Sequence, residues 1–271
     1  MVVLKNAPKL RLRSLQHSAV TAFFLDLLLA LLAMTALMVV AAMSWVVWRG
    51  VEVSLGVGGL PDTDSLIAAI GEPGVVALLL ISAISTGGAA LLLYWWRRRA
   101  SAGEIAVSLA ASRRTSTWGW AALTGVATHL ASSSISALAH YWGMQPQPTN
   151  VAVIESGMDA NPALLLVFAI VVAPAYEELL FRRVLFGRLW SAGRPILGLV
   201  LSSMAFAALH EVPGVGGNSL AATLWLWLVY SAMGAAYAVL YWRTGTLWAP
   251  IAAHALNNGL ALGALNLYGG S

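Results

Sequence analysis

Glu177, Glu178 and Arg182 place three ionisable side chains within an apolar run that is long enough to lie in lipid. Charge inside a bilayer costs several kcal/mol, so such residues usually serve a function. Glu178 and Arg182 are four residues apart and share a helix face, which predicts an ion pair between them. Glu177 points about 100° away from Glu178 and has no counter-ion on its own helix. Glu177 is therefore the candidate general base, with Glu178 and Arg182 as supporting residues.

Two further polar clusters occur in the apolar segments that follow, one at His210 and one from His254 to Asn258. His254 and Asn258 are four residues apart, and an imidazole and a carboxamide on one helix face can both donate hydrogen bonds to a developing oxyanion. His210 adds a second group that can handle protons. Two simpler interpretations stay open: an interhelical salt-bridge cluster around Arg182, and histidines that only hydrogen-bond to neighbouring helices.

The absence of several residue types and motifs excludes other catalytic mechanisms. The chain has no cysteine, which excludes disulfides, a thiol nucleophile and thiolate zinc sites. It contains neither a G-x-S-G serine motif nor a Gly-Asp pair of the aspartyl type. His210-Glu211-Val212-Pro213 is not H-E-x-x-H, because no second histidine follows and Pro213 would break the helical turn. A base, a second proton-handling group and oxyanion donors predict activation of water against a carbonyl group.

Three motifs, E-E-x-x-x-R, F-x-x-x-H and H-x-x-x-N, follow in this order between Leu164 and Asn258. They resemble the motifs of the CPBP family, which contains the CAAX prenyl endopeptidases and bacterial Abi-like relatives linked to bacteriocin processing or immunity. The resemblance implies an intramembrane endopeptidase that hydrolyses a peptide bond near the membrane surface. Its substrate would be a prenylated CAAX-type peptide or another membrane-associated peptide.

Residue roles follow from the same resemblance. Glu177 would be the general base on water, assisted by His210. His254 and Asn258 would form the oxyanion hole, and Glu178 and Arg182 would organise the pocket.

The resemblance also leaves a metal-dependent version open. An older view of the family as metalloproteases makes Glu177, His210 and His254 ligands of zinc, and two histidines with one glutamate are a legitimate catalytic zinc set. The metal-free version is favoured because Asn258 is a poor zinc ligand and a good oxyanion donor. We therefore expect no cofactor, with zinc as the alternative.

Composition predicts the elements that position these residues. Hydrophobic residues make up 59% of the 271 positions and charged residues 10%, far from soluble averages. In lipid, backbone groups must be satisfied within helices or a closed barrel. We predict an all-α, polytopic transmembrane helical bundle of about seven to eight membrane helices, as one domain over residues 1–271 with the motif-bearing core at about 162–267. The expected spans are 18–42, 74–96, 117–141, 162–187, 195–212, 219–242 and 246–267, and the expected linkers are 49–73 and 142–161.

The distribution of basic residues predicts the orientation and the partners. Lysines and arginines cluster before the first expected span, after the second and around the end of the fourth, which places the N-terminus in the cytoplasm. Because they lie in short loops rather than on one stripe, no nucleic-acid partner is expected. The expected partners are membrane lipids and a peptide or lipidated-protein substrate, and the expected location is the cell membrane.

Helix geometry gives a check on whether the three clusters meet. Glu177 and His210 each lie roughly 23 Å along their helices from the cytoplasmic interface, whereas His254 lies only about 13 Å past Gly245. The last segment must therefore be offset, tilted or entered through a re-entrant loop. Two alternatives to an enzyme remain: a non-enzymatic immunity or scaffold protein that binds a peptide in the same pocket, and a proton-coupled transporter, which also uses buried Glu and His.

Overall fold

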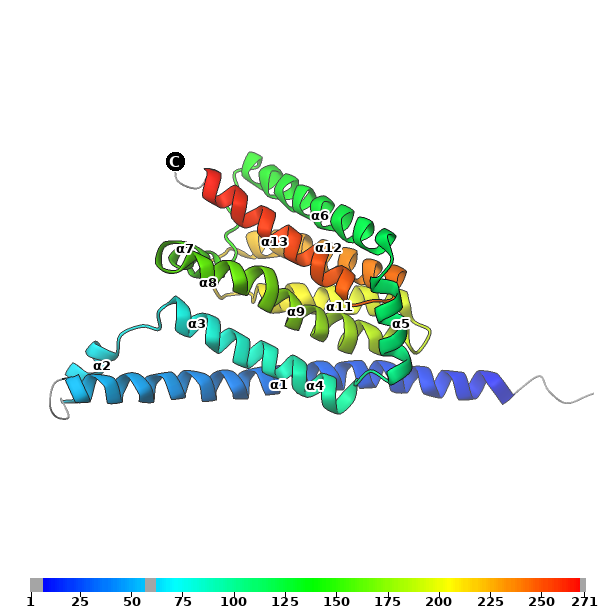
Figure 1. The fold of residues 1–271 in the computed structure, drawn as a ribbon, viewed down its shortest axis with the longest axis horizontal. Coiled ribbons are helices and arrows are strands. Elements are labelled where there is room, and N and C mark those ends of the chain that lie inside the picture. Colours follow the sequence, from blue (N-terminus) through cyan, green and yellow to red (C-terminus); the bar gives the residue numbers. More distant parts are fainter. Residues whose placement is uncertain (1–6, 57–61, 269–271) are drawn as a thin grey trace, which may run out of the picture.

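The computed structural model describes residues 7–56 and 62–268, with side chains placed for 18–56 and 62–267. Within these ranges the chain is helical and contains no strand, as the predicted all-α class requires. The helices are α1 (Ala7–Gly56), α2 (Thr63–Ile70), α3 (Val75–Ser82), α4 (Gly88–Arg97), α5 (Ala102–Ser112), α6 (Thr115–Tyr141), α7 (Val151–Ala160), α8 (Pro162–Val167), α9 (Ala173–Glu178), α10 (Gly187–Trp190), α11 (Pro195–His210), α12 (Leu220–Thr244) and α13 (Trp248–Tyr268). Figure 1 shows the long first helix along one edge of the bundle, with α3 and α4 beside it.

Three wider, π-helical stretches join some of these helices without a break. Ala83–Gly87 joins α3 to α4, Phe168–Val172 joins α8 to α9, and Leu179–Phe186 joins α9 to α10. Such stretches are rare and frequently occur at functional sites. Two of the three flank the Glu177–Glu178 pair.

Four helices are long and apolar enough to cross a membrane by length and composition: Ser18–Gly56, Val75–Arg97, Pro162–Trp190 and Leu220–Thr244. The other three expected spans coincide with α6, α11 and α13, of which α11 is a shorter apolar helix. Each of the seven expected spans thus corresponds to a helix. The protein is an all-α, polytopic membrane protein.

The two expected linkers are largely helical, which corrects the prediction. α1 continues to Gly56 instead of ending near residue 42, α2 follows it, and α7 occupies half of the second linker. The polar residues that indicated loops are in part helix caps, since the side chain of Asp62 accepts a hydrogen bond from the N–H of Ser65 at the start of α2. Residues 57–61 of the first linker lie outside the described residues.

α5 was not expected as an element at all. Its first turn carries a capping box, in which Ser101 and Glu104 hydrogen-bond to each other's backbone N–H groups. Of the basic residues expected before the first span, Lys5 lies outside the described residues, as do the side chains of Lys9, Arg11 and Arg13.

The main core lies between α1, α4, α11 and the helix that carries the Glu pair. Phe23 of α1, Phe181 and Phe206 are almost fully buried there, and the rings of Phe181 and Phe206 meet edge to face at 5.0 Å. Buried Asp26 of α1 also accepts hydrogen bonds from the Nε atoms of Arg97 (2.7 Å) and Arg188 (2.8 Å). These ion pairs connect α1 to both α4 and α10.

The turn between α12 and α13 sets where the helix that carries His254 begins. Gly245 closes α12 with a positive φ of 70°, and the next residue, Thr246, is fully buried. The hydroxyl groups of Thr246 and Ser108 of α5 lie 2.9 Å apart, so α5 crosses over this turn. α5 therefore covers this turn, whereas Trp248, the first residue of α13, is exposed. Figure 1 shows α13 inclined relative to α1.

Candidate active site

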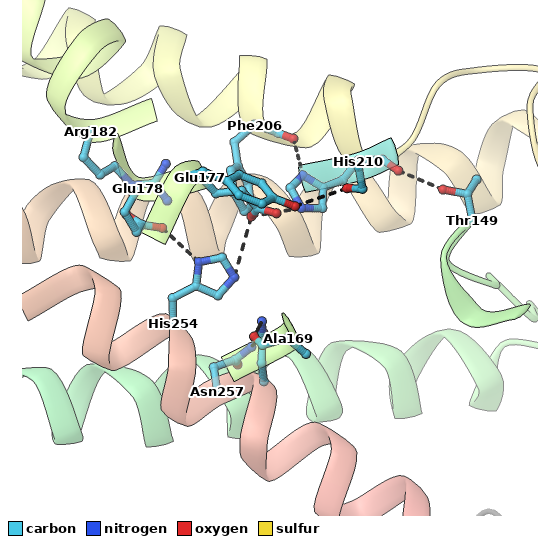
Figure 2. A network of polar contacts seen from close by, with 12 residues as sticks. Thr149, Ala169, Glu177, Glu178, Arg182, Phe206, His210, His254 and Asn257 are labelled. Carbon is cyan, nitrogen blue, oxygen red and sulfur yellow. Dashed lines mark hydrogen bonds and ion pairs between the residues drawn. The ribbon is translucent and has the colours of Figure 1, made fainter. Parts of the chain in front are cut away.

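Three separate helical segments bring the predicted site residues together (Figure 2). Glu177 and Glu178 end α9, His210 is the last residue of α11, and His254 lies in the second turn of α13. Arg182 comes from the π-helical stretch that follows α9.

Glu178 is the centre of the buried part of this cluster. The side chains of Glu178 and Arg182 are both inaccessible to solvent, and Arg182 Nε lies 2.9 Å from Glu178 Oε2. The ion pair expected from their spacing is therefore present. The other oxygen, Oε1, lies 3.0 Å from Nδ1 of His254. Glu178 thus holds a guanidinium with one oxygen and an imidazole with the other.

Aromatic rings surround the Arg182 guanidinium on the sides that Glu178 leaves open. Its central carbon lies 5.0 Å from the ring centroid of Phe206, 5.5 Å from that of Tyr237 and 5.9 Å from that of Phe181. Cations are attracted to ring faces at such distances. The charge of Arg182 is compensated by one carboxylate and three rings, while its three nitrogens form no hydrogen bond within the described part of the chain.

Glu177 faces two imidazoles from other helices. Its Oε2 lies 3.6 Å from Nε2 of His210 and 3.8 Å from Nε2 of His254. Both distances exceed hydrogen-bond length, and this buried oxygen has no hydrogen-bond partner. Glu177 therefore presents an unsatisfied carboxylate oxygen between two ring nitrogens, in addition to lacking a counter-ion on its own helix.

Hydrogen bonds at the far side of both rings determine where their protons lie. Nδ1 of His210 is 2.8 Å from the backbone carbonyl oxygen of Phe206; since a carbonyl can only accept, Nδ1 carries the hydrogen. By the same reasoning Nδ1 of His254 donates to the Glu178 carboxylate. When neutral, both rings therefore direct an unprotonated Nε2 at Glu177.

Asn258 lies somewhat apart from this cluster. Its Nδ2 donates to the backbone oxygen of Ala169 at 2.9 Å, and its Oδ1 accepts from Asn257 Nδ2 at 3.2 Å. Ala169 belongs to the π-helical stretch before α9, where carbonyl groups are available for side-chain partners. The structure thus places Asn258 on the face of α13 that carries His254, with one amide hydrogen already engaged.

Two tyrosines of α12 join the site, and sequence reasoning missed both. The ring of Tyr237 stacks on His254 at a centroid distance of 5.0 Å, and the ring of Tyr230 lies 4.6 Å from that of His210. Their spacing of seven residues, two helical turns, places them on one face. That spacing was the available signal, but it does not distinguish a site wall from ordinary packing.

A loop segment from the expected second linker also reaches His210. The Thr149 hydroxyl donates to the backbone oxygen of His210 at 3.0 Å, and the Thr149 N–H donates to the Glu211 carboxylate at 2.8 Å (Figure 2). These contacts satisfy the exposed end of α11 and hold His210 in place.

The three side chains around Glu177 Oε2 include donor types that bind metals. Two histidines and one glutamate match a zinc set in composition. Among the described residues, however, no group of three His, Cys, Asp or Glu side chains is arranged to hold a metal ion.

Comparisons with known proteins agree with the motif order. Residues 159–260 match the model of a family described as "Type II CAAX prenyl endopeptidase Rce1-like". This match supports the CPBP resemblance of the region that carries the motifs. All six predicted site residues fall within the matched region.

A relative in Bacillus subtilis (strain 168), described as "Putative membrane peptidase YdiL", is 32% identical over 139 residues. The alignment covers 51% of this chain and 52% of the relative, so the chain spans about half the length of the curated protein that it matches. No solved structure matches the chain.

Proposed function

We propose that the protein is an intramembrane endopeptidase in which Glu177 activates water for attack on a peptide bond. The observation that carries this proposal is the Glu177 Oε2 atom, which is buried and unpartnered between two Nε2 atoms. A buried polar oxygen without a partner is costly, so such groups call for a functional explanation. A carboxylate beside two imidazoles is suited to taking a proton from a bound water and passing it on.

The proposed reaction consumes one water molecule. Glu177 takes a proton from water while the water oxygen bonds to the peptide carbonyl carbon, and the C=O electron pair moves onto the carbonyl oxygen. His210, 3.6 Å from Glu177, accepts the proton from the carboxylate. When the intermediate collapses, the C–N bond breaks and the same proton passes to the leaving nitrogen. The products are a carboxylic acid and an amine.

His254 is proposed to stabilise the oxyanion as an imidazolium. Its Nδ1 donates to Glu178, so Nε2 can donate only if it also carries a hydrogen. Glu177 and Glu178 bring two negative charges and Arg182 one positive charge, which leaves one further proton to balance the cluster. A proton on His254 Nε2 makes the site neutral and supplies the donor. Asn258 would add its second amide hydrogen.

The proposed substrate is a prenylated CAAX-type peptide or another membrane-associated peptide. Support comes from the matched family description and from the description of the Bacillus subtilis relative as a membrane peptidase. Glu178 and Arg182 act as positioning residues in this scheme, because they contact His254 and each other rather than the reacting atoms.

Cleavage of quenched fluorescent peptides by the purified, detergent-solubilised protein tests the proposal. One peptide carries a prenyl-cysteine and a second has the same sequence without the lipid. We expect cleavage by the wild type, none by Glu177→Ala, and normal cleavage by the matched control Glu155→Ala, which alters an exposed acid in α7. Equal cleavage by wild type and Glu177→Ala would show that the base is assigned wrongly.

A cytoplasmic N-terminus is part of the proposal and can be tested separately. Because the chain has no cysteine, one introduced cysteine is the only thiol that can react with a labelling reagent. In intact cells, Ala152→Cys in α7 should react with a membrane-impermeant maleimide and Ala102→Cys in α5 should be protected. The reverse pattern would invert the orientation.

A further inference from the structure

The outer surface of α6 and α12 carries a groove that the proposed chemistry does not use. Its volume is about 380 Å³, and it runs from Trp120 and Arg243 at one end to Ile135 and Val229 at the other. The 14 residues from Val229 to Arg243 span roughly 21 Å of helix. Figure 1 shows α6 at the edge of the bundle, and lining residues of both helices, such as Leu123 and Val239, are exposed, so the groove lies on the outside of the molecule.

The groove presents an apolar surface even at its threonine and serine residues. The Thr128 hydroxyl donates to backbone oxygens of Thr124 and Gly125, and the Ser132 hydroxyl donates to that of His129. These hydroxyls are satisfied by their own helix, so they present mainly carbon atoms to an occupant. The small side chains of Ala127 and Ala131 line the groove among larger ones. An apolar depression of this kind on a membrane protein suits a hydrocarbon chain.

The mouth of the groove is strongly basic. Arg243 lies over the ring of Trp120 at 3.8 Å, and Arg113 and Arg114 lie within roughly 10 Å of Trp120 along the helix axis. All three arginines are exposed. In the part of the chain that the structure describes, none of them forms an ion pair with a carboxylate. Three arginines without a carboxylate partner therefore lie towards this end of α6 and α12, and Arg243 itself lines the groove.

We infer that this groove binds one anionic phospholipid, with an acyl chain along α6 and α12 and its phosphate at Arg243. Arginine forms bidentate hydrogen bonds to phosphate oxygens, and a tryptophan at the same level is typical of the membrane interface. The groove, about 21 Å long, is longer than one leaflet of a roughly 30 Å hydrocarbon core is thick, so a whole acyl chain fits along it. A transmembrane helix of that length fills on the order of 1,600 Å³ and is too wide.

Native mass spectrometry of the delipidated full-length protein tests this inference without any activity assay. Phosphatidylglycerol and phosphatidylcholine with identical acyl chains are the probes. We expect one tightly bound phosphatidylglycerol and weaker binding of phosphatidylcholine. Arg243→Gln should weaken phosphatidylglycerol binding about fivefold, since each basic residue near the surface contributes about 1 kcal/mol. Arg49→Gln, which removes the same charge at the far end of α1, should have no effect.

A second pair of variants tests the apolar part. Ala127→Phe fills the groove and should abolish the bound lipid, whereas Ala122→Phe places the same ring on an exposed face of α6 outside the groove. Gel filtration checks that both variants remain folded. Equal binding of the two lipids, or unchanged binding in both Arg243→Gln and Ala127→Phe, would overturn the inference. A dimer that Ala127→Phe dissociates, with lipid binding unaltered, would assign the groove to a second copy of the chain instead.

Discussion

Nδ1 of His254 lies 3.0 Å from Oε1 of Glu178, the carboxylate that also neutralises Arg182. One acid therefore links the orientation of an imidazole in the site to the stability of a buried cation. The Nδ1 contact fixes which ring nitrogen faces Glu177. Removal of Glu178 or of Arg182 leaves the other group as an uncompensated charge in the protein interior.

Glu178→Gln should therefore reduce both stability and activity. Loss of one partner from a buried ion pair costs about 3–5 kcal/mol, and kcat should fall at least tenfold as His254 loses its charged acceptor. The double variant Glu178→Gln/Arg182→Met removes the stranded cation, so its thermal midpoint should recover while kcat stays low. A wild-type midpoint for the single variant, measured in the same detergent, contradicts the ion-pair argument.

Tyr237→Leu should lower activity because it removes the ring that stacks on His254. Aromatic pairs are worth about 0.5–1.5 kcal/mol beyond their burial, which corresponds to roughly a two- to twelvefold loss in kcat. Tyr237→Phe keeps the ring and removes only the hydroxyl, which lies 3.4 Å from that of Thr128, and should stay within twofold of the wild type. If the two variants lose activity equally, the hydroxyl matters rather than the ring.

Asp26→Asn should destabilise the fold and spare the chemistry. It leaves Arg97 and Arg188 without a carboxylate. We expect a loss of roughly 2–3 kcal/mol, below the value for a fully buried pair because both guanidiniums keep some contact with solvent. The thermal midpoint should fall, and kcat per folded molecule should be unchanged. Asp64→Asn, in the exposed first turn of α2, is the matched control. A changed kcat in Asp26→Asn would place α1 in the catalytic mechanism.

Acidification should weaken the docking of α5. Hydrogen bonds from Arg183, together with that from the Ser101 N–H, lower the pKa of Glu104 to about 2. The folded pKa lies below the unfolded value of about 4.3, so this stabilisation is complete above that pH and is lost as the pH falls towards 2. Because Glu104 is half exposed, the effect should be about 0.2–1 kcal/mol.

The measurement is the thermal midpoint between pH 6 and pH 3 for wild type and Glu104→Gln. The two curves should converge as the pH falls. Glu155→Gln, in exposed α7, should run parallel to the wild type. Parallel curves for all three proteins would mean that the Glu104–Arg183 contact does not contribute.

Peptide cleavage should be insensitive to metal chelators. The described residues contain no three-ligand group placed to hold a metal ion, and the proposed base and oxyanion donors need none. We expect unchanged kcat after dialysis against 1,10-phenanthroline and EDTA. Inhibition that added zinc reverses would support the metal-dependent alternative, in which Glu177, His210 and His254 are the ligands.

Local spacing predicted the contacts that lie within one helix. The Glu178–Arg182 pair follows from a separation of four residues, and the helical nature of the expected spans follows from their length and apolarity. The contact between Glu178 and His254 joins residues 76 positions apart, and no periodicity encodes it. It depends on the position at which α13 starts, which in turn depends on Thr246 and Ser108.

The predicted linkers show a second kind of limit. Gly, Pro, Asp and Asn indicated loops at 49–73 and 142–161, yet some of these residues cap short helices there. The same side chains favour turns and helix starts, so composition alone does not separate the two. Asn258 is a third case: its separation from His254 predicted a shared face, while its hydrogen bond to Ala169 depends on a π-helical stretch that the sequence did not reveal.

The crossing of α5 over the α12–α13 turn also bears on the order of events during synthesis. Ser108 and Thr246 are 138 residues apart, so at 5–20 residues per second α5 leaves the ribosome roughly 7–28 s before its partner. By the time Thr246 emerges, the surface that sets the depth of α13 has had time to form. A chain that stalls before residue 246 would hold Glu178 and Arg182 as a pair and lack His254. By the proposed mechanism, newly made protein would therefore have no peptidase activity until α13 is in place.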